Sequence, residues 1–247
     1  MITFTDISIV IGDKPILQHI SCTIDAGDFI VIVGPNGAGK TTFFDMISGK
    51  RIPAHGTITF NGTDVTQHNE QQRASFISRL FQNPQLNGIG SMTVAQNLAL
   101  STYKGKQVSL KNGMSPFPVH LMNDLKHLNL GSKKILDTPM HRLSGGQRQL
   151  LACIMATAVP PQLFLLDEPT AALDPASATK LLQFAIRWIR EHRITTILIT
   201  HDPQLALTIG NKIWILENGT LSQQINKQSS PHLSPSDLIG HIDYEVL

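Results

Sequence analysis

One stretch near the start of the sequence constrains the fold more than any other. Phe29–Val33 (FIVIV) is a run of apolar residues without alternation, and it is followed by a glycine-rich segment, Gly34–Gly39, and by a helix-forming segment, Lys40–Ser48. A short apolar run of this kind is typical of a strand that is buried on both faces of a parallel sheet. The stretch therefore predicts a strand, a tight loop and a helix in direct succession.

The glycine-rich segment also predicts a phosphate site, because it fits the pattern G-x-x-x-x-G-K-[ST] in the required strand–loop–helix context. Glycines let successive backbone N–H groups surround a phosphate, and the positive end of the following helix adds to the attraction. Lys40 is expected to contact the β- and γ-phosphates, and the Thr41 hydroxyl is expected to bind Mg²⁺. The residues predicted to touch the nucleotide here are Gly34, Pro35, Asn36, Gly37, Ala38, Gly39, Lys40, Thr41 and Thr42.

A pair of carboxylates follows a second buried-strand run, Leu163–Leu166. Ligands in open α/β sheets bind at the carboxyl ends of the strands, so Asp167 and Glu168 are candidates for the same site. Asp167 is placed to hold Mg²⁺, while Glu168, which points elsewhere, is placed to polarise a water for attack on the γ-phosphate. Pro169 favours an extended conformation for Glu168.

A second glycine-rich helix start occurs about 100 residues after the first. Ser144-Gly145-Gly146 precedes the apolar run Leu150–Ala158, and Ser144 is a good N-cap residue. Glycines in a first turn cost around 1 kcal/mol each relative to alanine, so a cap alone does not account for them. We interpret the pair as a place where an anion approaches the bare N–H groups of a helix.

Together these segments resemble the ABC-type ATPases. Leu143–Gln147 (LSGGQ) resembles the signature motif of that family, and GPNGAGKTT, LFLLDEP and the isolated His201 occur in the family's order and spacing. Gln82, in LFQNP, matches the loop glutamine that links the nucleotide to the membrane partner, and Ala172–Asp174 matches the loop that crosses the dimer. The resemblance covers about residues 2 to 222.

The resemblance implies roles for these residues. Glu168, His201 and Gln82 would be catalytic, with His201 as the γ-phosphate sensor, and Thr41, Gln82 and Asp167 would hold Mg²⁺. The family forms a head-to-tail homodimer in which each ATP lies between the phosphate loop of one subunit and the signature helix of the other. The residues implied to contact the partner's nucleotide are Ser144, Gly145, Gly146, Gln147 and Asp174. Asp174, before Pro175, is also an expected helix cap.

One position departs from the family. An aromatic residue usually stacks on adenine in a segment shaped like aromatic-Gly-Asp-Lys, and Ile11 stands there in IGDK. Losing the stack would weaken binding by about 1–2 kcal/mol on the scale of base–aromatic stacking, which makes adenine preference less secure than phosphate binding. Phe4 could replace the missing ring only if the strand register differed from the expected one.

Strands that alternate with helices predict an α/β fold, and the resemblance implies a P-loop NTPase. The expected parts are a mainly parallel central sheet, an N-terminal antiparallel β subdomain, and an inserted α-helical subdomain at about residues 88–160. We expect an ATPase domain over 1–222 and a short appendage over 223–247, and Thr102–Pro118 is expected to be a loop.

The composition excludes several classes of function. Charged residues make up 15% of the chain and the net charge is +2, without Lys/Arg clusters, so no nucleic-acid partner is expected. The sequence shows no secretory signal and no apolar run near the ~20 residues that a membrane span needs. Cys22 and Cys153 are expected to be buried thiols, and His120 and His127, although on one helix face, are expected not to form a metal site.

We therefore hypothesise the ATPase subunit of an ABC importer, soluble by itself and held at the cytoplasmic face of the inner membrane by permease subunits. A substrate-binding protein would complete the system, and the motif context most resembles a group linked to amino-acid cargo, including aromatic amino acids. An exporter of lipids or drugs is the alternative within transport. A non-transport ATPase acting on DNA or ribosomes would carry coiled coils or tandem halves, and intact Glu168 and His201 argue against a non-hydrolysing scaffold.

Overall fold

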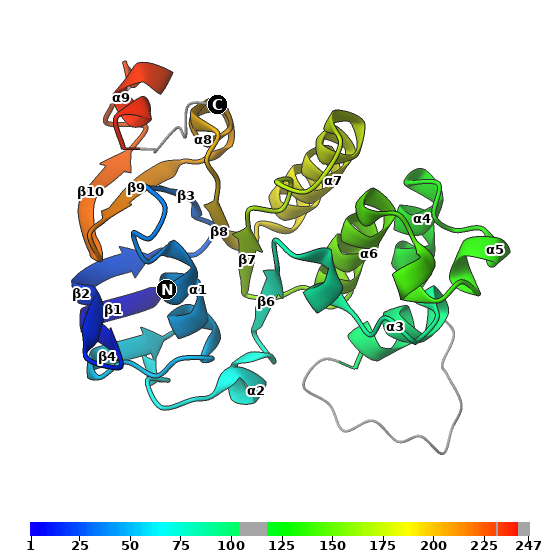
Figure 1. Cartoon of the computed structure of the whole chain (residues 1–247), viewed down its shortest axis with the longest axis horizontal. Helices are drawn as coiled ribbons and strands as arrows, with labels where there is room; N and C mark the ends of the chain where they lie inside the picture. Colours follow the sequence, from blue (N-terminus) through cyan, green and yellow to red (C-terminus); the bar gives the residue numbers. More distant parts are fainter. Residues whose placement is uncertain (104–117, 231, 242–247) are drawn as a thin grey trace.

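The computed structural model describes residues 1–103, 118–230 and 232–241, so most of the loop expected at Thr102–Pro118 and the last six residues lie outside the description. Two sheets form the left-hand part of the molecule in Figure 1, and a group of helices forms the right-hand part. The smaller sheet is antiparallel in the order β2-β1-β4-β5. Its strands are β1 (Ile2–Ile11), β2 (Lys14–Ile24), β4 (His55–Phe60) and β5 (Thr63–Asp64).

The larger sheet has the order β10-β9-β3-β8-β7-β6, and every neighbouring pair except β10 with β9 is parallel. Its strands are β3 (Phe29–Val33), β6 (Ile77–Leu80), β7 (Leu163–Asp167), β8 (Thr195–Ile199), β9 (Lys212–Glu217) and β10 (Thr220–Asn226). The expected mainly parallel sheet, with an antiparallel β part before it, is confirmed.

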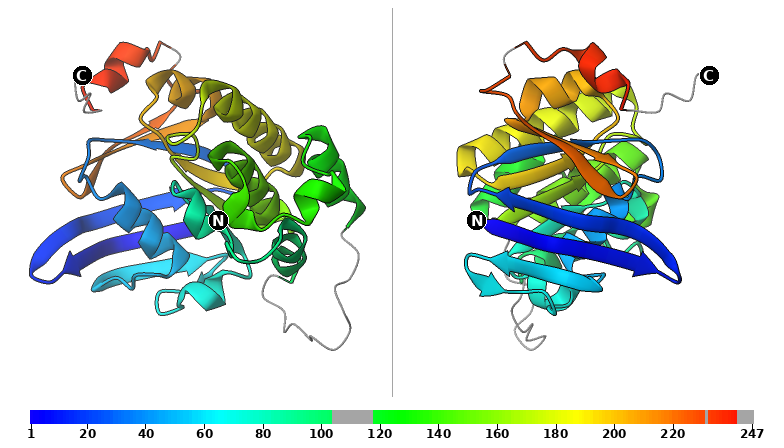
Figure 2. Two further views of the ribbon diagram at one scale, coloured as in Figure 1. Left: turned by 45° about the vertical axis from the view of Figure 1, so that its right-hand side comes forward. Right: turned by 90° about the vertical axis from the view of Figure 1, so that its left-hand side faces the viewer.

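The helices fall on both faces of the larger sheet. The longest are α1 (Lys40–Ser48), α3 (Val94–Ser101), α4 (Val119–His127), α6 (Gly145–Thr157) and α7 (Pro175–His192). Shorter ones are α2 (Glu70–Arg73), α5 (Lys133–Leu136), α8 (Pro203–Ile209) and α9 (Pro235–Ile239), with 3-10 turns η1 (Pro84–Asn87) and η3 (Met140–Arg142). The helices α3 to α6 form the group expected at about residues 88–160 (Figures 1 and 2).

Two hydrophobic cores lie on opposite faces of the larger sheet, and β3 belongs to both because its side chains alternate. Ile30 and Ile32 pack with α1 and the smaller sheet, while Val31 and Val33 pack with α6 and α7. The phosphate-loop helix and the signature helix are therefore separated by the sheet.

The chain after residue 222 continues the domain in the described region. The strand β10 runs to Asn226 and pairs with β9, past the boundary expected at 222. The turn between them, Asn218-Gly219, has both φ angles positive, which is the geometry of a tight hairpin. Leu238 of α9 is fully buried in the core that contains α6 and α7, and His241 bonds Glu217 of β9.

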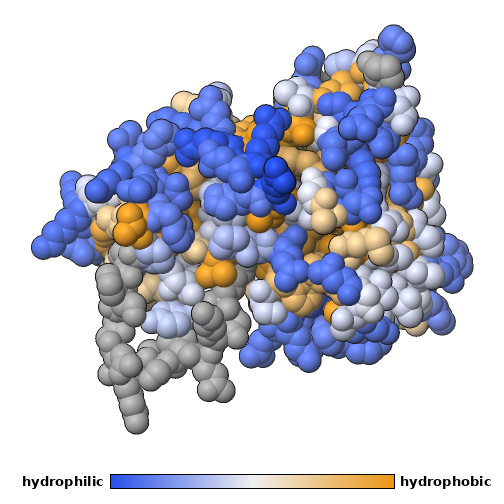
Figure 3. Space-filling view, turned by 180° about the vertical axis from the view of Figure 1, so that it is seen from behind, coloured by the Kyte–Doolittle hydropathy of each residue, from blue (hydrophilic) through white to orange (hydrophobic). Residues whose placement is uncertain are grey.

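No helix in the described part of the chain is long and apolar enough to span a bilayer. The face shown in Figure 3 is mostly polar, with apolar side chains in small groups. Both cysteines are buried, as expected, and burial raises the pKa of the Cys153 thiol to about 12 and that of Cys22 further, so both are protonated at neutral pH.

Candidate functional site

The parallel strands bring the predicted site residues to one edge of the larger sheet. Because β3, β8, β7 and β6 run in the same direction, their carboxyl ends meet there. The phosphate loop follows β3, His201 follows β8, Asp167 and Glu168 end β7, and Gln82 follows β6. Four segments from across the sequence thus converge at this edge of the sheet.

The phosphate loop has a conformation that only glycine allows at several points. Gly37 and Gly39 have φ of 78° and 102°, in the left-handed region. At Gly34 a Cβ would lie 2.1 Å from the carbonyl oxygen of Leu216 in β9, so the loop starts where two backbones touch. The glycines at 34, 37 and 39 are needed for this shape before any ligand is considered.

The start of α1 is built to receive an anion. Its N-cap is Gly39, which has no side chain to bond the first N–H groups of the helix. Lys40 is only 7% exposed, and its Nζ donates to the carbonyl oxygens of Gly34 (2.6 Å) and Pro35 (2.9 Å). The ammonium group is therefore held over the loop, and a helix start without a side-chain cap next to a cation fits a phosphate chain.

A distant hairpin braces the loop. The Gly219 N–H donates to the Ala38 carbonyl oxygen (3.2 Å), and the Gly219 carbonyl oxygen accepts from the Gln18 N–H (2.8 Å). Gly219 has φ of 77°, and a Cβ there would lie 2.3 Å from the Ile16 carbonyl oxygen. The β9–β10 turn thus joins the loop to β2.

Glu168 and His201 form a direct pair. The Nε2 of His201 lies 2.7 Å from Oε1 of Glu168, and both side chains are partly exposed. Together with Thr200 and Ala171 they line an open pocket of about 380 Å³. An acidic group next to an imidazole at the mouth of a pocket is suited to orienting a water.

The expectation that Pro169 keeps Glu168 extended is wrong. Glu168 has φ of 43°, in the left-handed region, and its N–H donates to the Ile199 carbonyl oxygen at 3.1 Å. The bond to the neighbouring strand and the contact with His201 outweigh the local preference that proline imposes. A residue other than glycine held in this region is a form of backbone strain that is common at functional sites.

Two buried polar residues at the site, Arg79 and Gln149, were not predicted from the sequence. The Nη2 of Arg79, in β6, donates to Oδ2 of Asp167 at 2.6 Å. Gln149, in α6, is fully buried, and its Nε2 donates to the carbonyl oxygens of Phe81 (2.9 Å) and Pro169 (3.3 Å). Gln149 thus joins α6 to the segments next to Gln82 and Glu168, and its only signal in the sequence is a polar residue at the edge of an apolar run.

The start of α6 is capped from within the chain. Ser144 Oγ accepts a hydrogen bond from the Gln147 N–H (3.2 Å), and Gln147 Oε1 accepts one from the Ser144 N–H (3.2 Å). The two bonds form a capping box. At Gly146 a Cβ would lie 2.4 Å from Ser177 Oγ, so packing against α7 is by itself a reason for this glycine, and its predicted contact with an anion stays a prediction. Gly145 is exposed and a Cβ there would meet nothing within 4 Å, so the folded chain does not explain it.

Asp174 lies beside the signature segment and is the expected helix cap. Its Oδ1 accepts from the Ser177 N–H at 3.0 Å, and the bonds from Ser177 lower the pKa of its carboxyl group. Its Oδ2 lies 3.7 Å from the position that a Cβ of Gly146 would take. The starts of α6 and α7 therefore form one exposed surface.

Ile11 and Phe4, the two residues considered for stacking on adenine, differ in exposure. Ile11 ends β1 beside the Gly12-Asp13 turn and is 39% exposed. Phe4 is 1% exposed and packs on Phe43 with ring centroids 5.7 Å apart, so it is not available to a base.

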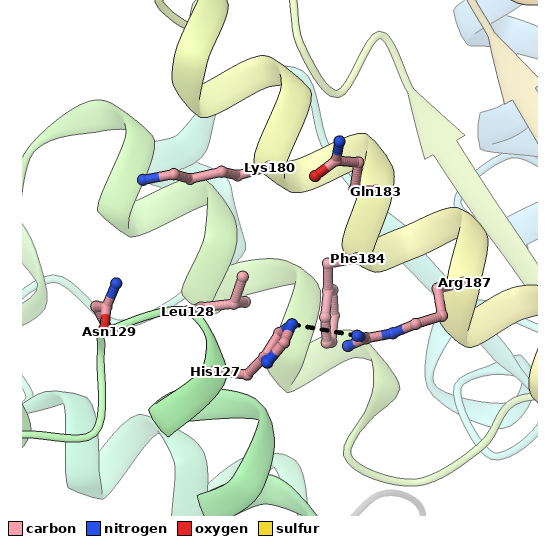
Figure 4. A pocket seen from close by; sticks show the side chains of 7 residues that line it. All are labelled: His127, Leu128, Asn129, Lys180, Gln183, Phe184 and Arg187. Atoms are coloured by element: carbon pink, nitrogen blue, oxygen red, sulfur yellow. Dashed lines mark hydrogen bonds between the residues drawn. The ribbon is translucent and has the colours of Figure 1, made fainter.

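The two histidines of α4 have protein partners. His127 Nε2 lies 3.2 Å from Arg187 Nη1, at a shallow pocket of about 270 Å³ between α4 and α7 (Figure 4), and His120 Nε2 lies 3.4 Å from the Ala158 carbonyl oxygen. Within the described residues, no group of three or more His, Cys, Asp or Glu could hold a metal. A magnesium site at the strand ends would instead need oxygen ligands from Asp167, Thr41 and Gln82, and the last two are exposed at the same edge.

Comparison with known proteins gives one consistent result. The family described as ABC transporter matches residues 17–171. The tyrosine transport ATP-binding protein of Clostridioides difficile is 37% identical over 235 residues, which cover 94% of this chain and 92% of that protein. The phosphate import ATP-binding protein PstB of Aeropyrum pernix is 33% identical over 220 residues, 86% of this chain and 85% of that one. The dimeric structure of MJ0796, a bacterial ABC transporter cassette, superposes with a TM-score of 0.76 at 25% identity, over 92% of this chain and 98% of that one.

Proposed function

Since this chain belongs to the ABC transporter family, we propose that it hydrolyses MgATP in a head-to-tail dimer and thereby drives a membrane permease that imports a small solute. Members of the family bind and hydrolyse ATP, and the chain is accordingly an ATP-binding subunit of an ABC transporter. The observation that carries the proposal is the convergence of the phosphate loop, Asp167, Glu168 and His201 at one sheet edge.

The phosphate loop binds the nucleotide through backbone N–H groups at the start of α1 and through Lys40. On binding, the Lys40 ammonium exchanges its bonds to Gly34 and Pro35 for the β- and γ-phosphates. Thr41, Gln82 and Asp167 are the oxygen donors that would hold Mg²⁺, which would neutralise charge on the phosphates. Asp167 fits this role because only its Oδ2 is engaged by Arg79.

Glu168 orients the attacking water. Its Oε1 is held by His201, which leaves Oε2 to accept a hydrogen bond from a water in the open pocket. The positive φ of Glu168 turns the side chain out of the direction that β7 would give it. His201 fixes the carboxylate and, in the closed dimer, contacts the γ-phosphate.

The dimer supplies the remaining contacts. The surface formed by Ser144, Gly145 and Asp174 is exposed, and α6 and α1 lie on opposite faces of the sheet, so this surface does not serve the phosphate loop of its own chain. We infer that it closes over ATP bound by a second copy. The likeness to a cassette solved as a dimer supports this arrangement.

The permease docks beside Gln82. Leu86 and Ile89, a few residues further on, are 64% and 47% exposed. They adjoin a shallow pocket of about 420 Å³ that is lined by Pro84, Gln85, Gly88, Gly90, Met140, His141 and Arg148. An apolar surface on the segment that follows Gln82 would couple permease binding to nucleotide binding, because the same segment takes part in both. Docking there would hold the chain at the cytoplasmic face of the membrane.

The cargo that we propose is an amino acid, delivered by a substrate-binding protein. The support is the relative named for tyrosine transport, which matches nearly the whole chain, and the import function in the name of the second relative. The test is reconstitution of the ATPase with its co-purifying permease and binding protein in proteoliposomes. ATP-dependent uptake of labelled tyrosine is expected, whereas ATP-driven export, or uptake of unrelated solutes only, would contradict the cargo.

The catalytic assignment is tested on the purified protein. We expect Glu168→Gln to lower the rate of phosphate release by about 10²–10⁴-fold while ATP binding, measured by calorimetry, persists. Asp202→Asn is the matched control, because Asp202 is an exposed acidic residue next to His201 that caps α8. A Glu168→Gln variant that hydrolyses ATP as fast as wild type would show that another group orients the water.

A further inference from the structure

Arg79 is a charged residue at a position where a strand normally carries an apolar one. It lies in β6 between Ser78 and Leu80, and its side chain is only 6% exposed. Buried charges are rare and costly unless they are paired and hydrogen-bonded. The partners of this guanidinium group therefore indicate why it is present.

The two arms of the guanidinium group reach two different elements. Nη1 lies 2.6 Å from Oδ1 of Asp45 in α1, and Nη2 lies 2.6 Å from Oδ2 of Asp167 at the end of β7. Both carboxylates are 8% exposed. One rigid group thus joins the helix that follows the phosphate loop to the strand that ends in the proposed metal ligand.

The same group reaches the segment that leads to Gln82. The guanidinium carbon lies 4.5 Å from the centre of the Phe81 ring, and Phe81 is the residue before Gln82. Stacking on an aromatic face restrains the plane of the group further. Arg79 therefore contacts the three segments that carry the proposed metal ligands Thr41, Asp167 and Gln82.

The charges around Arg79 are uneven. At the Asp45 end, Lys50 Nζ and Arg51 Nε lie 3.7 Å and 3.6 Å from Oδ2, so that carboxylate is balanced by several cations. At the Asp167 end, the ion pairs of the described residues include only Arg79, and they engage only Oδ2. The Oδ1 atom of Asp167 is left for another positive charge.

We propose that Arg79 is a positioning residue that fixes the Asp167 carboxylate for divalent metal bound with ATP, using Asp45 as its anchor. The proposal rests on the metal role given above to Asp167. Groups that orient a metal ligand typically change metal affinity by about 10–100-fold when they are lost. Lysine could not replace Arg79, because a single ammonium cannot span both carboxylates with a planar fork.

The test compares Arg79→Lys with Arg73→Lys. Arg73 is also buried, but its guanidinium donates only to carbonyl oxygens, of Met46, Ile47, Val65 and Thr66, at the far end of α1. Both substitutions keep the charge and disturb a buried fork, so general loosening affects both. All proteins carry Glu168→Gln to stop hydrolysis, and calorimetry gives the Kd for ATP in excess Mg²⁺ and in EDTA.

We expect Arg79→Lys to leave the Kd in EDTA within about twofold and to reduce the gain in affinity from Mg²⁺ by about tenfold. Arg73→Lys should lower the thermal midpoint and leave that gain unchanged. An Arg79→Lys protein with the wild-type gain, or an equal loss in Arg73→Lys, would overturn the proposal.

A third variant separates this proposal from the one on which it rests. Asp167→Asn should reduce the Mg²⁺-dependent gain at least as much as Arg79→Lys. If Asp167→Asn keeps the gain, the metal role of Asp167 is wrong and the role of Arg79 falls with it. If Asp167→Asn loses the gain and Arg79→Lys keeps it, only the positioning role of Arg79 is wrong.

Discussion

The two glycine-rich helix starts, at α1 and α6, look alike in the sequence and differ in the structure. The start of α1 has a glycine cap, no side-chain bond to its first N–H groups, and a buried lysine held over them. The start of α6 has a serine cap and a complete capping box, and its second glycine packs against Ser177 of the same chain.

The difference is between a site left open by its own chain and one partly closed by it. At α1 the N-cap residue has no side chain to bond the first N–H groups, and the Lys40 ammonium is held over the same loop. At α6 the chain itself supplies the capping bonds, and Gly146 packs against Ser177. Gly145 and its neighbours Ser144 and Asp174 are exposed and face solvent. The first start is expected to bind ATP in the monomer, and the second is expected to act only after another subunit brings ATP to it.

The largest effect should come from the open start. Lys40→Ala removes the cation that faces the phosphates, and loss of one member of a buried charge pair costs about 2–5 kcal/mol. ATP affinity should therefore fall on the order of 100-fold or more, measured by calorimetry. Lys50→Ala, which removes an exposed lysine two residues past the end of α1, is the control. Tight ATP binding by Lys40→Ala would mean that the loop does not act as we describe.

The next effect concerns the trans arrangement. Ser144→Arg should abolish ATPase activity while ATP binding by the monomer persists, because the added side chain blocks only the partner's nucleotide. Mixing this variant with Lys40→Ala should restore activity, since a mixed dimer has one composite site with neither defect. A mixture that forms dimers, detected by light scattering, and remains inactive would contradict the claim that the start of α6 acts on ATP bound by the partner.

The two glycines of α6 should then separate stability from activity. Gly146→Ala places a Cβ within 2.9 Å of Ser177 Cβ, and overpacking of this kind costs about 1–3 kcal/mol of unfolding free energy. Gly145→Ala meets open space and should keep or slightly raise stability, but it should lower dimer ATPase activity. Urea unfolding and phosphate release measure the two quantities. Equal loss of stability in both variants would contradict the separation.

The smallest effect should come from the cap. Ser144→Ala removes one half of the capping box and should cost about 1 kcal/mol of unfolding free energy. Thr93→Ala breaks the equivalent capping box of α3 and should cost a similar amount. Only Ser144→Ala should also reduce ATPase activity, and parallel losses of activity in both would reduce Ser144 to a structural cap.

Local signals predicted much of this fold correctly. The apolar run at β3 and the glycine-rich pattern predicted a strand, a loop and a helix in succession, and the structure has them at these residues. Such features depend on neighbours in the chain, which is why the residues themselves disclose them.

Features that depend on specific contacts between distant residues were not predicted. Glu168 takes a positive φ because β8 and His201 hold it, and Gly146 is required by Ser177 of another helix. Arg79 drew no prediction from the sequence, because its partners Asp45 and Asp167 lie 34 and 88 positions away. The roles of the site residues themselves stay predictions until the variants above are measured.

The contact between Gly219 and the phosphate loop has a consequence for the order in which the chain can mature during synthesis. The phosphate loop lies within the first 42 residues, yet it contacts Leu216 of β9 and the turn at Gly219. While the ribosome is still adding the intervening residues, the nascent chain contains the loop but not the residues that contact it. We therefore expect nucleotide to stabilise the subunit fully only after Leu216 and Gly219 have been added and have reached the loop.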